Sequence, residues 1–287
     1  MKKYLLIAFA IFSSFLLNAQ PINEDTVKVR WGTFNIRYNN QSDYKIDCGW
    51  KQRRERVYKY LLDNEIDICG MQEVTNKQYK YLRKKLTGYD HVGVGRTNGK
   101  KRGEASPVFY RKDRFKALDK GNFWLSEKPD VVGSKGWDAA LERVASWVKL
   151  KDKKTGRIFM AVNTHFDHKG KIARRESAKL IMRKIQEIVG DNPAVVTGDF
   201  NVTEQDEAYT TMVTNDFKMY DAYHMTENNT GEKYTFHNFC RIPADKAEKI
   251  DFIFITPNIK VIHTHIEQPN KECQLSDHNP HYADLQF

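Results

Sequence analysis

The stretch Ala194-Val-Val-Thr-Gly-Asp-Phe-Asn-Val-Thr-Glu-Gln-Asp206 places two polar residues at the end of a buried strand. Its apolar start, Ala194 to Val196, predicts the strand, and Gly198 lets the backbone turn tightly after it. Asp199 and Asn201 are two residues apart, so their side chains can point the same way into a cleft. A carboxylate beside a neutral amide suits a site that holds a hard cation and a phosphate oxygen together, because the amide donates hydrogen bonds without adding negative charge.

Polar side chains follow apolar strands at six places along the chain. One strand that ends on a carboxylate is common. Six that end on Asn, Glu, His or Asp indicate a shared rim above a sandwich core, where ligand sites tend to form. The six strand ends are Thr33-Phe-Asn35, Met71-Gln-Glu73, Asn163-Thr-His165-Phe-Asp-His168, Gly198-Asp-Phe-Asn201, Lys249-Ile-Asp251 and Ser276-Asp-His278.

The residue types at this rim favour a hard cation. Glu73, Asp199 and Asp277 offer carboxylate oxygens, with no thiolate partner and few clustered histidines. Oxygen ligands of this kind suit Mg²⁺ or Mn²⁺ rather than zinc. We therefore expect a divalent metal ion as the cofactor.

The same rim carries groups suited to proton transfer. His165 and His278 can exchange protons near neutral pH, and Asp251 can orient one imidazole and raise its basicity. Such a set fits attack of water on phosphorus, where a cation and one His stabilise charge while an Asp–His pair activates the water. Taken singly, each residue has an ordinary alternative: Asn35 can simply end a strand, and Glu73 can cap a helix.

In their order along the chain, the six strand-end motifs resemble those of the endonuclease/exonuclease/phosphatase superfamily. This superfamily includes DNase I, exonuclease III, neutral sphingomyelinases, inositol polyphosphate 5-phosphatases and deadenylases. The resemblance covers residues 27–287 and implies an α/β fold, the DNase I-like four-layer αββα sandwich, with the site at one end of the two sheets. It is carried by Phe-Asn35, Gln-Glu73, Asn-Thr-His165, Gly-Asp199-Phe-Asn201, Ile-Asp251-Phe-Ile and Ser-Asp277-His278.

The resemblance also implies a metal site. Glu73 matches the main metal ligand, and Asn35 and Asp277 match positions close to the ion. Asp199 matches a residue that orients the attacking water or shares the metal. Asn201 matches a residue that holds the phosphate.

For proton transfer, the resemblance implies that His278 is the general base and is paired to Asp251. His165 matches the histidine that donates to the phosphate or to the leaving group in the DNase I and sphingomyelinase branches. Asp167 and His168 either line the site or form a surface turn before Gly170.

The first twenty residues form a separate segment. Met1-Lys2-Lys3 is positively charged, Tyr4 to Leu17 is almost wholly apolar, and Ala19 offers a small residue for cleavage. This pattern predicts a secretory signal peptide over residues 1–20. A transmembrane anchor is the alternative, but the apolar run is shorter than the ~20 residues that a span requires. We expect an exported protein, periplasmic or secreted, after cleavage near Ala19.

Residues 21–287 are expected to form one catalytic domain, because no linker rich in Pro, Gly or Ser divides them. Loss of Lys2 and Lys3 lowers the formal charge from +10 to +8, and this excess either favours an anionic partner or serves solubility. The four cysteines show no zinc spacing. Cys69 lies in an apolar strand and is predicted to be a buried free thiol.

Hydrophobic periodicity predicts an irregular alternation of strands and helices. The helix at 171–189 is the clearest, with an apolar face expected to include Ile172 and Ile181. The segment 123–143 is expected to be a long loop. Strands are predicted at 27–36, 66–73, 91–95, 106–110, 144–150, 158–164, 194–196, 250–256, 260–266 and 281–287, and helices at 51–64, 75–86, 171–189 and 204–214.

Two interpretations of the middle of the chain remain open. Its aromatic and basic residues can form a wall for an anionic aromatic ligand, or the tryptophans can pack the long loop onto the core while the basic side chains are solvated. No exposed apolar hairpin suited to a membrane surface is evident, so a lipid substrate ranks lower. The residues concerned are Trp124, Trp137, Arg143, Arg96, Lys100, Lys101 and Arg102.

Together these patterns predict an exported, Mg²⁺- or Mn²⁺-dependent phosphoesterase that hydrolyses phosphodiester bonds. Its substrate would be a phosphate ester from a nucleic acid, a nucleotide, a lipid head group or a sugar phosphate. We expect a monomer with no stable protein partner. The alternatives are a phosphomonoesterase that acts on a sugar or inositol phosphate, and a non-catalytic module that binds anions on the same fold.

Overall fold

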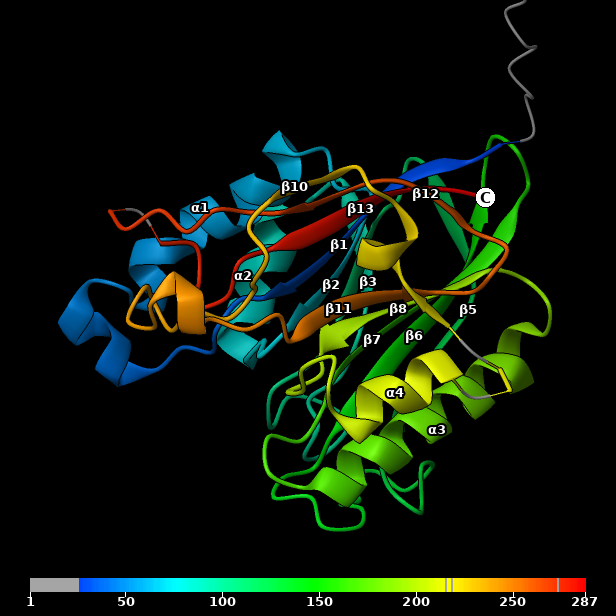
Figure 1. The fold of residues 1–287 in the computed structure, drawn as a ribbon, viewed down its shortest axis with the longest axis horizontal. Coiled ribbons are helices and arrows are strands. Elements are labelled where there is room, and N and C mark those ends of the chain that lie inside the picture. Colours follow the sequence, from blue (N-terminus) through cyan, green and yellow to red (C-terminus); the bar gives the residue numbers. More distant parts are fainter. Residues whose placement is uncertain (1–25, 215, 218, 273) are drawn as a thin grey trace, which may run out of the picture.

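The chain folds into two β-sheets that pack face to face, with helices on both outer faces (Figure 1). The computed structural model describes residues 26–214, 216–217, 219–272 and 274–287. The predicted signal peptide, residues 1–20, lies outside the described residues. None of the helices in the described part is long and apolar enough to cross a membrane.

The first sheet contains seven strands from both ends of the chain. They are β1 (Lys28–Asn35), β2 (Ile68–Gln72), β3 (Tyr89–Val92), β4 (Val108–Arg111), β10 (Asn229–Gly231), β12 (Lys260–Ile266) and β13 (His281–Gln286). Their order across the sheet is β10-β12-β13-β1-β2-β4-β3. The central β1 pairs antiparallel with β13 and parallel with β2, so the sheet is mixed.

The second sheet contains six strands, and it is also mixed. They are β5 (Phe115–Trp124), β6 (Val144–Asp152), β7 (Ile158–His165), β8 (Ala194–Asp199), β9 (Tyr220–Asp221) and β11 (Asp251–Ile255). Their order is β5-β6-β7-β8-β11-β9. Strands β7 and β8 are parallel, whereas β8 and β11 are antiparallel.

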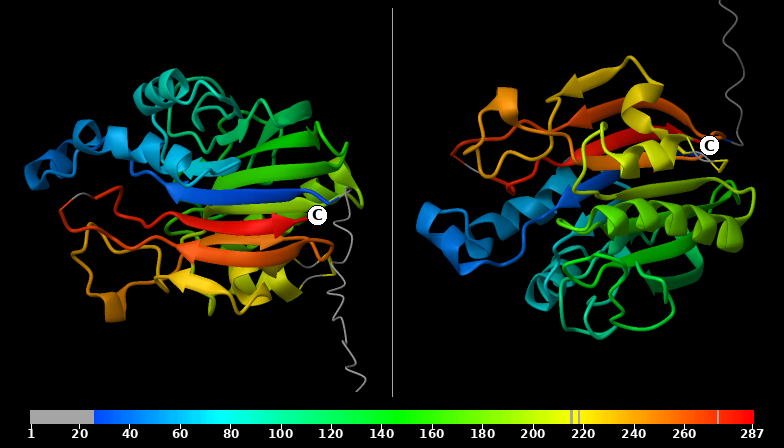
Figure 2. Two further views of the ribbon diagram at one scale, coloured as in Figure 1. Left: turned by 90° about the horizontal axis from the view of Figure 1, so that it is seen from above. Right: turned by 60° about the horizontal axis from the view of Figure 1, so that its bottom comes forward.

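Four α-helices complete the outer layers (Figure 2). They are α1 (Trp50–Asp63), α2 (Asn76–Lys85), α3 (Lys171–Val189) and α4 (Glu207–Thr214), and three short 3₁₀ helices cover Gln41–Ile46, Ala222–Met225 and Ala244–Lys246. A capping box opens α2, in which the Thr75 backbone N–H donates to Gln78 Oε1 at 3.1 Å.

Three apolar layers hold the molecule together. Trp31 and Phe159 lie between the two sheets, Val57 and Leu82 lie between the first sheet and its helices, and Ile181 belongs to the layer between the second sheet and α3 and α4. The four-layer αββα architecture expected from the sequence is therefore confirmed.

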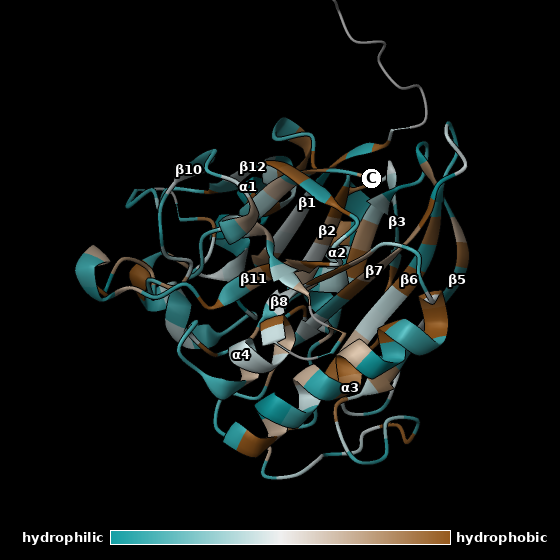
Figure 3. Ribbon diagram, turned by 45° about the vertical axis from the view of Figure 1, so that its right-hand side comes forward, coloured by the Kyte–Doolittle hydropathy of each residue, from teal (hydrophilic) through white to brown (hydrophobic). Residues whose placement is uncertain are grey.

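Helix α3 has the predicted bounds, but the prediction that Ile172 belongs to its buried apolar face is wrong. Ile181 is fully buried, whereas Ile172 is 47% exposed. Nine residues separate them, which is two and a half turns of an α-helix, so their side chains point to opposite sides. Figure 3 shows hydrophilic and hydrophobic segments alternating along this helix.

The sequence did not predict strand β5, the longest strand described. It lies at the edge of its sheet and, among the described strands, pairs only with β6. Seven of its ten residues are not buried. An edge strand with few buried side chains shows little hydrophobic alternation, so the hydrogen bonds to β6 define it. The thiol of Cys69 is buried and free, as predicted.

A buried polar contact joins the two sheets directly beneath their common end. Asn163 on β7 donates from Nδ2 to the carbonyl oxygens of Met71 (2.7 Å) and Pro107 (3.0 Å). In return, Gln72 Nε2 donates to Asn163 Oδ1 at 2.7 Å. Gly70 lies against Asn163, and a Cβ atom at this position would overlap its side chain. The approach of the sheets therefore requires glycine at position 70.

Substitution Gly70→Ala should destabilise the protein by about 2–3 kcal/mol, because the added methyl group overpacks a buried hydrogen-bonded contact. Gly88→Ala is the matched control, since a Cβ there meets no atom within 4 Å, and its effect should stay within about 0.5 kcal/mol. Urea unfolding of both variants measures the difference. Equal stability of the two variants would show that the sheets do not depend on this contact.

Candidate active site

The candidate site residues lie where strands of both sheets end. In the second sheet, His165 at the end of β7 pairs with Asp199 at the end of β8, and Asp199 pairs with Asp251 at the start of β11. In the first sheet, Asn35 ends β1. Because strand ends of a sandwich share one edge, residues far apart in sequence come together there.

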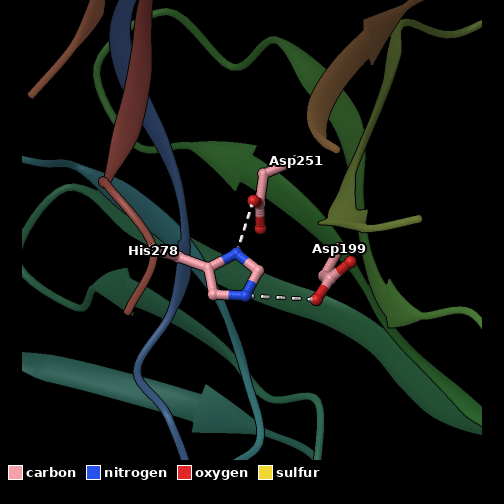
Figure 4. Close-up of side chains that lie close together, drawn as sticks. All are labelled: Asp199, Asp251 and His278. Atoms are coloured by element: carbon pink, nitrogen blue, oxygen red, sulfur yellow. Dashed lines mark hydrogen bonds and ion pairs between the residues drawn. The ribbon is translucent and has the colours of Figure 1, made fainter. Parts of the chain in front are cut away.

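His278 lies between two aspartates, as Figure 4 shows. Its Nδ1 donates to Asp251 Oδ2 at 2.8 Å, and its Nε2 lies 3.8 Å from Asp199 Oδ2. The Phe236 ring packs against the imidazole with a centroid distance of 4.9 Å. Burial alone would lower the pKa of His278, but Asp251 and Asp199 outweigh it and raise the pKa to about 10. Asp251 therefore fixes both the orientation and the charge of this ring.

The pKa of His165 is shifted in the opposite direction from that of His278. Its Nε2 lies 3.5 Å from Asp199 Oδ2, and the side chain is buried close to Arg143. Burial and the nearby guanidinium lower its pKa well below the ordinary value. The pKa values of two histidines in one site are thus shifted in opposite directions: in the metal-free protein that of His165 is lowered and that of His278 is raised.

The side-chain amide of Asn35 links the carboxylates of Glu73 and Asp199. Asn35 Nδ2 donates to Asp199 Oδ2 at 2.9 Å and to Glu73 Oε1 at 3.3 Å, and the backbone N–H of Tyr38 donates to Glu73 Oε2 at 2.8 Å. Glu73 itself adopts a left-handed backbone conformation, with φ of 62°. Asn35 presents its amide nitrogen, not its oxygen, to the two acids.

These acids suit a divalent cation. Burial and the negative charge of Asp277 raise the pKa of Glu73 to about 7, and burial and Asp251 raise the pKa of Asp199 to about 6. A hard cation bound between these carboxylates would favour their ionised forms and offset the effect of burial. Glu73, Asp277 and Asp199 thus fit Mg²⁺ or Mn²⁺.

A second acidic group among the described residues already contains its cation. Glu204, Asp221 and His224 bring ligand atoms within 4.8 Å of one another. The ammonium group of Lys249 lies 2.8 Å from both Glu204 and Asp221. An ion pair of this kind does not require a metal.

The residues of the site open onto a cleft of about 530 Å³. Of the residues predicted from the sequence, six line it, whereas Asn35 and Asp251 are buried behind them. The lining residues are Arg37, Tyr38, Glu73, Arg96, Glu104, Leu141, Arg143, His165, His168, Asp199, Asn201, Phe236, Asn238, Ile250, Asp277 and His278.

Asn201 follows Asp199 in a left-handed turn, with φ of 50°. Its backbone N–H donates to Asp199 Oδ1 at 2.9 Å, and its Nδ2 donates to the carbonyl oxygen of Phe166 at 3.0 Å. The amide group is thus held at the cleft wall beside the carboxylate, and its predicted role in holding phosphate remains a prediction.

Of the two residues predicted either to line the site or to form a surface turn, His168 is exposed and lines the cleft, whereas Asp167 does not line it. Asp167 is buried and accepts hydrogen bonds from the backbone N–H groups of Ala140, Leu141, Lys169 and Gly170. Burial alone would raise the pKa of Asp167, but these donors outweigh it and lower the pKa. Asp167 therefore anchors the end of the long loop to β7.

Arg143 lies beside this anchor, and its side chain is only 4% exposed. Its Nε donates to Asp167 Oδ2 at 3.4 Å, and its Nη2 lies 3.2 Å from His168 Nδ1. Nη1 is buried and has no partner among the described residues. A buried guanidinium with an unused donor at a cleft favours an anionic ligand.

The tryptophans pack the long loop and do not form a wall of the cleft. Trp124 is 4% exposed, and its Nε1 donates to the carbonyl oxygen of Arg96 at 2.6 Å. Trp137 packs against the apolar layer beneath α3. Of the basic side chains, Arg96 and Arg143 line the cleft, whereas Lys100, Lys101 and Arg102 are exposed.

The sequence did not point to Arg37, Phe236 or Asn238, although all three line the cleft. They lie in loops whose course depends on tertiary contacts. Only Arg37 carried a local signal, because a charged residue two positions after Asn35 stays close to the end of the same strand. Its guanidinium lies 3.0 Å from Asp43 Oδ2 and 3.4 Å from Asp277 Oδ2.

The two sheets flanked by helices carry acids and histidines at one end, a set of groups that suits attack of water on a phosphate ester. In a comparison with known protein families, residues 32–278 match the endonuclease/exonuclease/phosphatase family. The chain belongs to this family. Its members are phosphoesterases and typically use a divalent metal.

Similar solved structures come from Bacteroides species. An endonuclease/exonuclease/phosphatase from Bacteroides vulgatus is 56% identical with a TM-score of 0.88, and the match covers 90% of this chain and 98% of that one. A mannosyl-6-phosphatase from Bacteroides thetaiotaomicron is 38% identical with a TM-score of 0.84, covering 90% of this chain and 100% of that one.

A more distant similarity is found among eukaryotic proteins. Nocturnin from Drosophila melanogaster is 21% identical over 215 residues, which are 67% of this chain and 31% of that protein. The chain thus spans about a third of the length of the curated relatives it matches.

Substitution Glu73→Gln should stabilise the metal-free protein at pH 8 by about 1–3 kcal/mol. The folded protein holds the Glu73 proton up to a pKa of about 7, whereas the unfolded chain releases it near pH 4.5. The wild type therefore loses stability as the pH rises between these values, and the variant does not. Thermal unfolding in EDTA measures the difference.

Added Mg²⁺ or Mn²⁺ should make the wild type more stable than the Glu73→Gln protein, because the metal binds and stabilises the wild type and not the variant. Glu227→Gln, which removes the same charge at an exposed position, should respond to metal as the wild type does. Equal metal-induced stabilisation of the Glu73→Gln protein would exclude Glu73 as a ligand.

Proposed function

We propose that this protein is a divalent-metal-dependent phosphomonoesterase that hydrolyses small organic phosphates such as sugar phosphates. The observation that carries the proposal is the set of three arginines, Arg37, Arg96 and Arg143, that line one cleft with the acids and histidines. Guanidinium groups suit phosphate oxygens, and the unused Nη1 donor of Arg143 suits an anionic ligand.

The size of the cleft favours a small substrate. A volume of about 530 Å³ lies within the range of small-molecule sites, which are about 300–1,000 Å³. Part of the cleft wall is apolar and consists of Leu141, Phe236 and Ile250. The match to a mannosyl-6-phosphatase over that whole chain supports a sugar phosphate as the substrate class.

Glu73, Asp277 and Asp199 would hold Mg²⁺ or Mn²⁺, with Asn35 linking Glu73 and Asp199. When bound, the cation supplies Lewis acidity at the phosphate oxygens and neutralises negative charge that raises the pKa of His278. Asn201 and Arg143 would contact the phosphate. Each of these assignments follows from a side chain at the cleft or directly behind it.

In this proposal His278 is neutral once the negative charges of Asp199 and Asp277 are compensated, so its Nε2 takes a proton from the attacking water, and Asp251 stabilises the imidazolium that forms. The water oxygen bonds to phosphorus, and the bond from phosphorus to the alcohol oxygen breaks. The departing alcohol oxygen takes a proton from solvent water, and His278 returns its own proton to solvent. The neutral His165 donates a hydrogen bond to the phosphate or to the departing oxygen.

A phosphodiester, which the sequence analysis favoured, is the second candidate. The exposed basic residues Lys100, Lys101 and Arg102 follow Arg96 in one loop. A cationic surface next to a cleft attracts polyanions such as nucleic acids. A non-catalytic anion-binding module would hydrolyse neither phosphomonoesters nor phosphodiesters.

Release of phosphate from mannose 6-phosphate and of nitrophenolate from p-nitrophenyl phosphate and bis-p-nitrophenyl phosphate separates these candidates. We expect Mg²⁺- or Mn²⁺-dependent turnover of the monoesters, lost in EDTA. His278→Ala should reduce kcat/KM about 10²–10⁴-fold while the protein stays folded. Faster turnover of the diester than of either monoester would favour the second candidate, and anion binding in EDTA without any hydrolysis would favour the module.

Export is proposed from the first twenty residues alone. N-terminal sequencing of the protein recovered outside the cytoplasm of the expressing bacterium should give a chain that starts near Gln20. A protein that retains Met1 and stays in the cytoplasm would refute this proposal.

A further inference from the structure

A strained turn borders the cleft. Asn238, Phe239 and Cys240 have φ values of 49°, 55° and 60°, in the left-handed region that residues other than glycine rarely adopt. Three such residues in succession persist only where surrounding contacts over-determine the backbone. Strain of this kind is concentrated at sites that contact ligands.

The turn is fixed to the segment that carries the proposed general base. The backbone N–H groups of His237 and Asn238 both donate to the carbonyl oxygen of Asp277, at 3.1 Å each. Phe239 is buried, with its ring centroid 5.6 Å from the guanidinium of Arg53. The position of Asn238 is therefore set relative to the site itself.

The side chain presented by this turn is unused within the protein. Asn238 lines the cleft, and its side-chain amide makes no hydrogen bond to any residue that the structure describes. An amide both donates and accepts hydrogen bonds without a charge, as a hydroxyl group does. Phe236, two residues earlier, adds an apolar ring to the same wall.

We infer that Asn238 is a specificity residue: its amide hydrogen-bonds a hydroxyl group of the alcohol that carries the phosphate. The strained turn thereby selects polyhydroxylated alcohols, such as sugars, over aryl alcohols. The arginines and acids of the cleft recognise the phosphate and not the alcohol, so Asn238 supplies a contact that they do not. This inference rests on the proposed monoesterase function.

The test compares mannose 6-phosphate with p-nitrophenyl phosphate, which carries no hydroxyl group on its leaving alcohol. Asn238→Gly removes the amide and suits the left-handed backbone. The ratio of kcat/KM for the sugar phosphate to that for the aryl phosphate should fall about tenfold, as expected when a hydrogen bond to an uncharged group is lost. The loss should appear mainly as a higher KM for the sugar phosphate.

Asn238→Asp provides a second variant in case the glycine variant folds poorly. Aspartate also tolerates the left-handed region and keeps the size of the side chain, but when ionised it has no donor. Its added charge acts on the phosphate of both substrates, so the ratio isolates the effect on the alcohol. Glu65→Gly is the matched control, because Glu65 is exposed, has φ of 51° and precedes β2 at the end away from the cleft.

An unchanged ratio in the folded Asn238 variants would overturn the inference, since a merely structural role lowers both activities together. A wild type that hydrolyses p-nitrophenyl phosphate without preferring the sugar phosphate would also overturn it, while leaving the proposed monoesterase intact. Absence of turnover with both monoesters would instead refute the proposed function, and the inference with it.

Discussion

The close approach of the two sheets at Gly70 and Asn163 is the constraint on which the rest of the structure depends. Asn163 hydrogen-bonds backbone carbonyl groups of the opposite sheet, so the two strand systems are joined by polar contacts as well as by apolar packing. Each donor and acceptor in this contact is buried and would be costly to leave unpaired. The strand ends above it are therefore held in a fixed relation, and the site is built from those ends.

Above this contact, the site concentrates charge that the apolar layers could not tolerate. Glu73 and Asp199 have raised pKa values because burial and neighbouring acids disfavour their charged forms. His278 has a raised pKa because Asp251 and Asp199 surround it. Such an arrangement reduces the stability of the empty protein and prepares it for a cation and a phosphate, which is the usual relation between stability and function at an active site.

Loops complete the site, and each is anchored by buried polar groups. Asp167 holds the end of the long loop through four backbone N–H groups. Arg53 on α1 is fully buried and donates to the carbonyl oxygens of Ile36 and Leu275, at 2.9 and 2.7 Å, and thereby ties the segment before His278 to the segment after Asn35. These anchors explain how strained backbone at Glu73 and Asn238 persists next to a cleft.

The sequence by itself determined the fold class and the strand ends. Apolar runs and apolar alternation predicted nearly all central strands, because these strands bury most of their side chains. The motifs around Asp199, Asp251 and His278 identified residues that the structure brings within a few ångströms of one another. The edge strand β5 lacked such a pattern, and the motif around His165 did not reveal that its Asn163 joins the two sheets. The opposite pKa shifts of His165 and His278, the burial of Arg143 and the position of Asn238 were decided only by the tertiary structure, because each depends on neighbours that are distant in the chain.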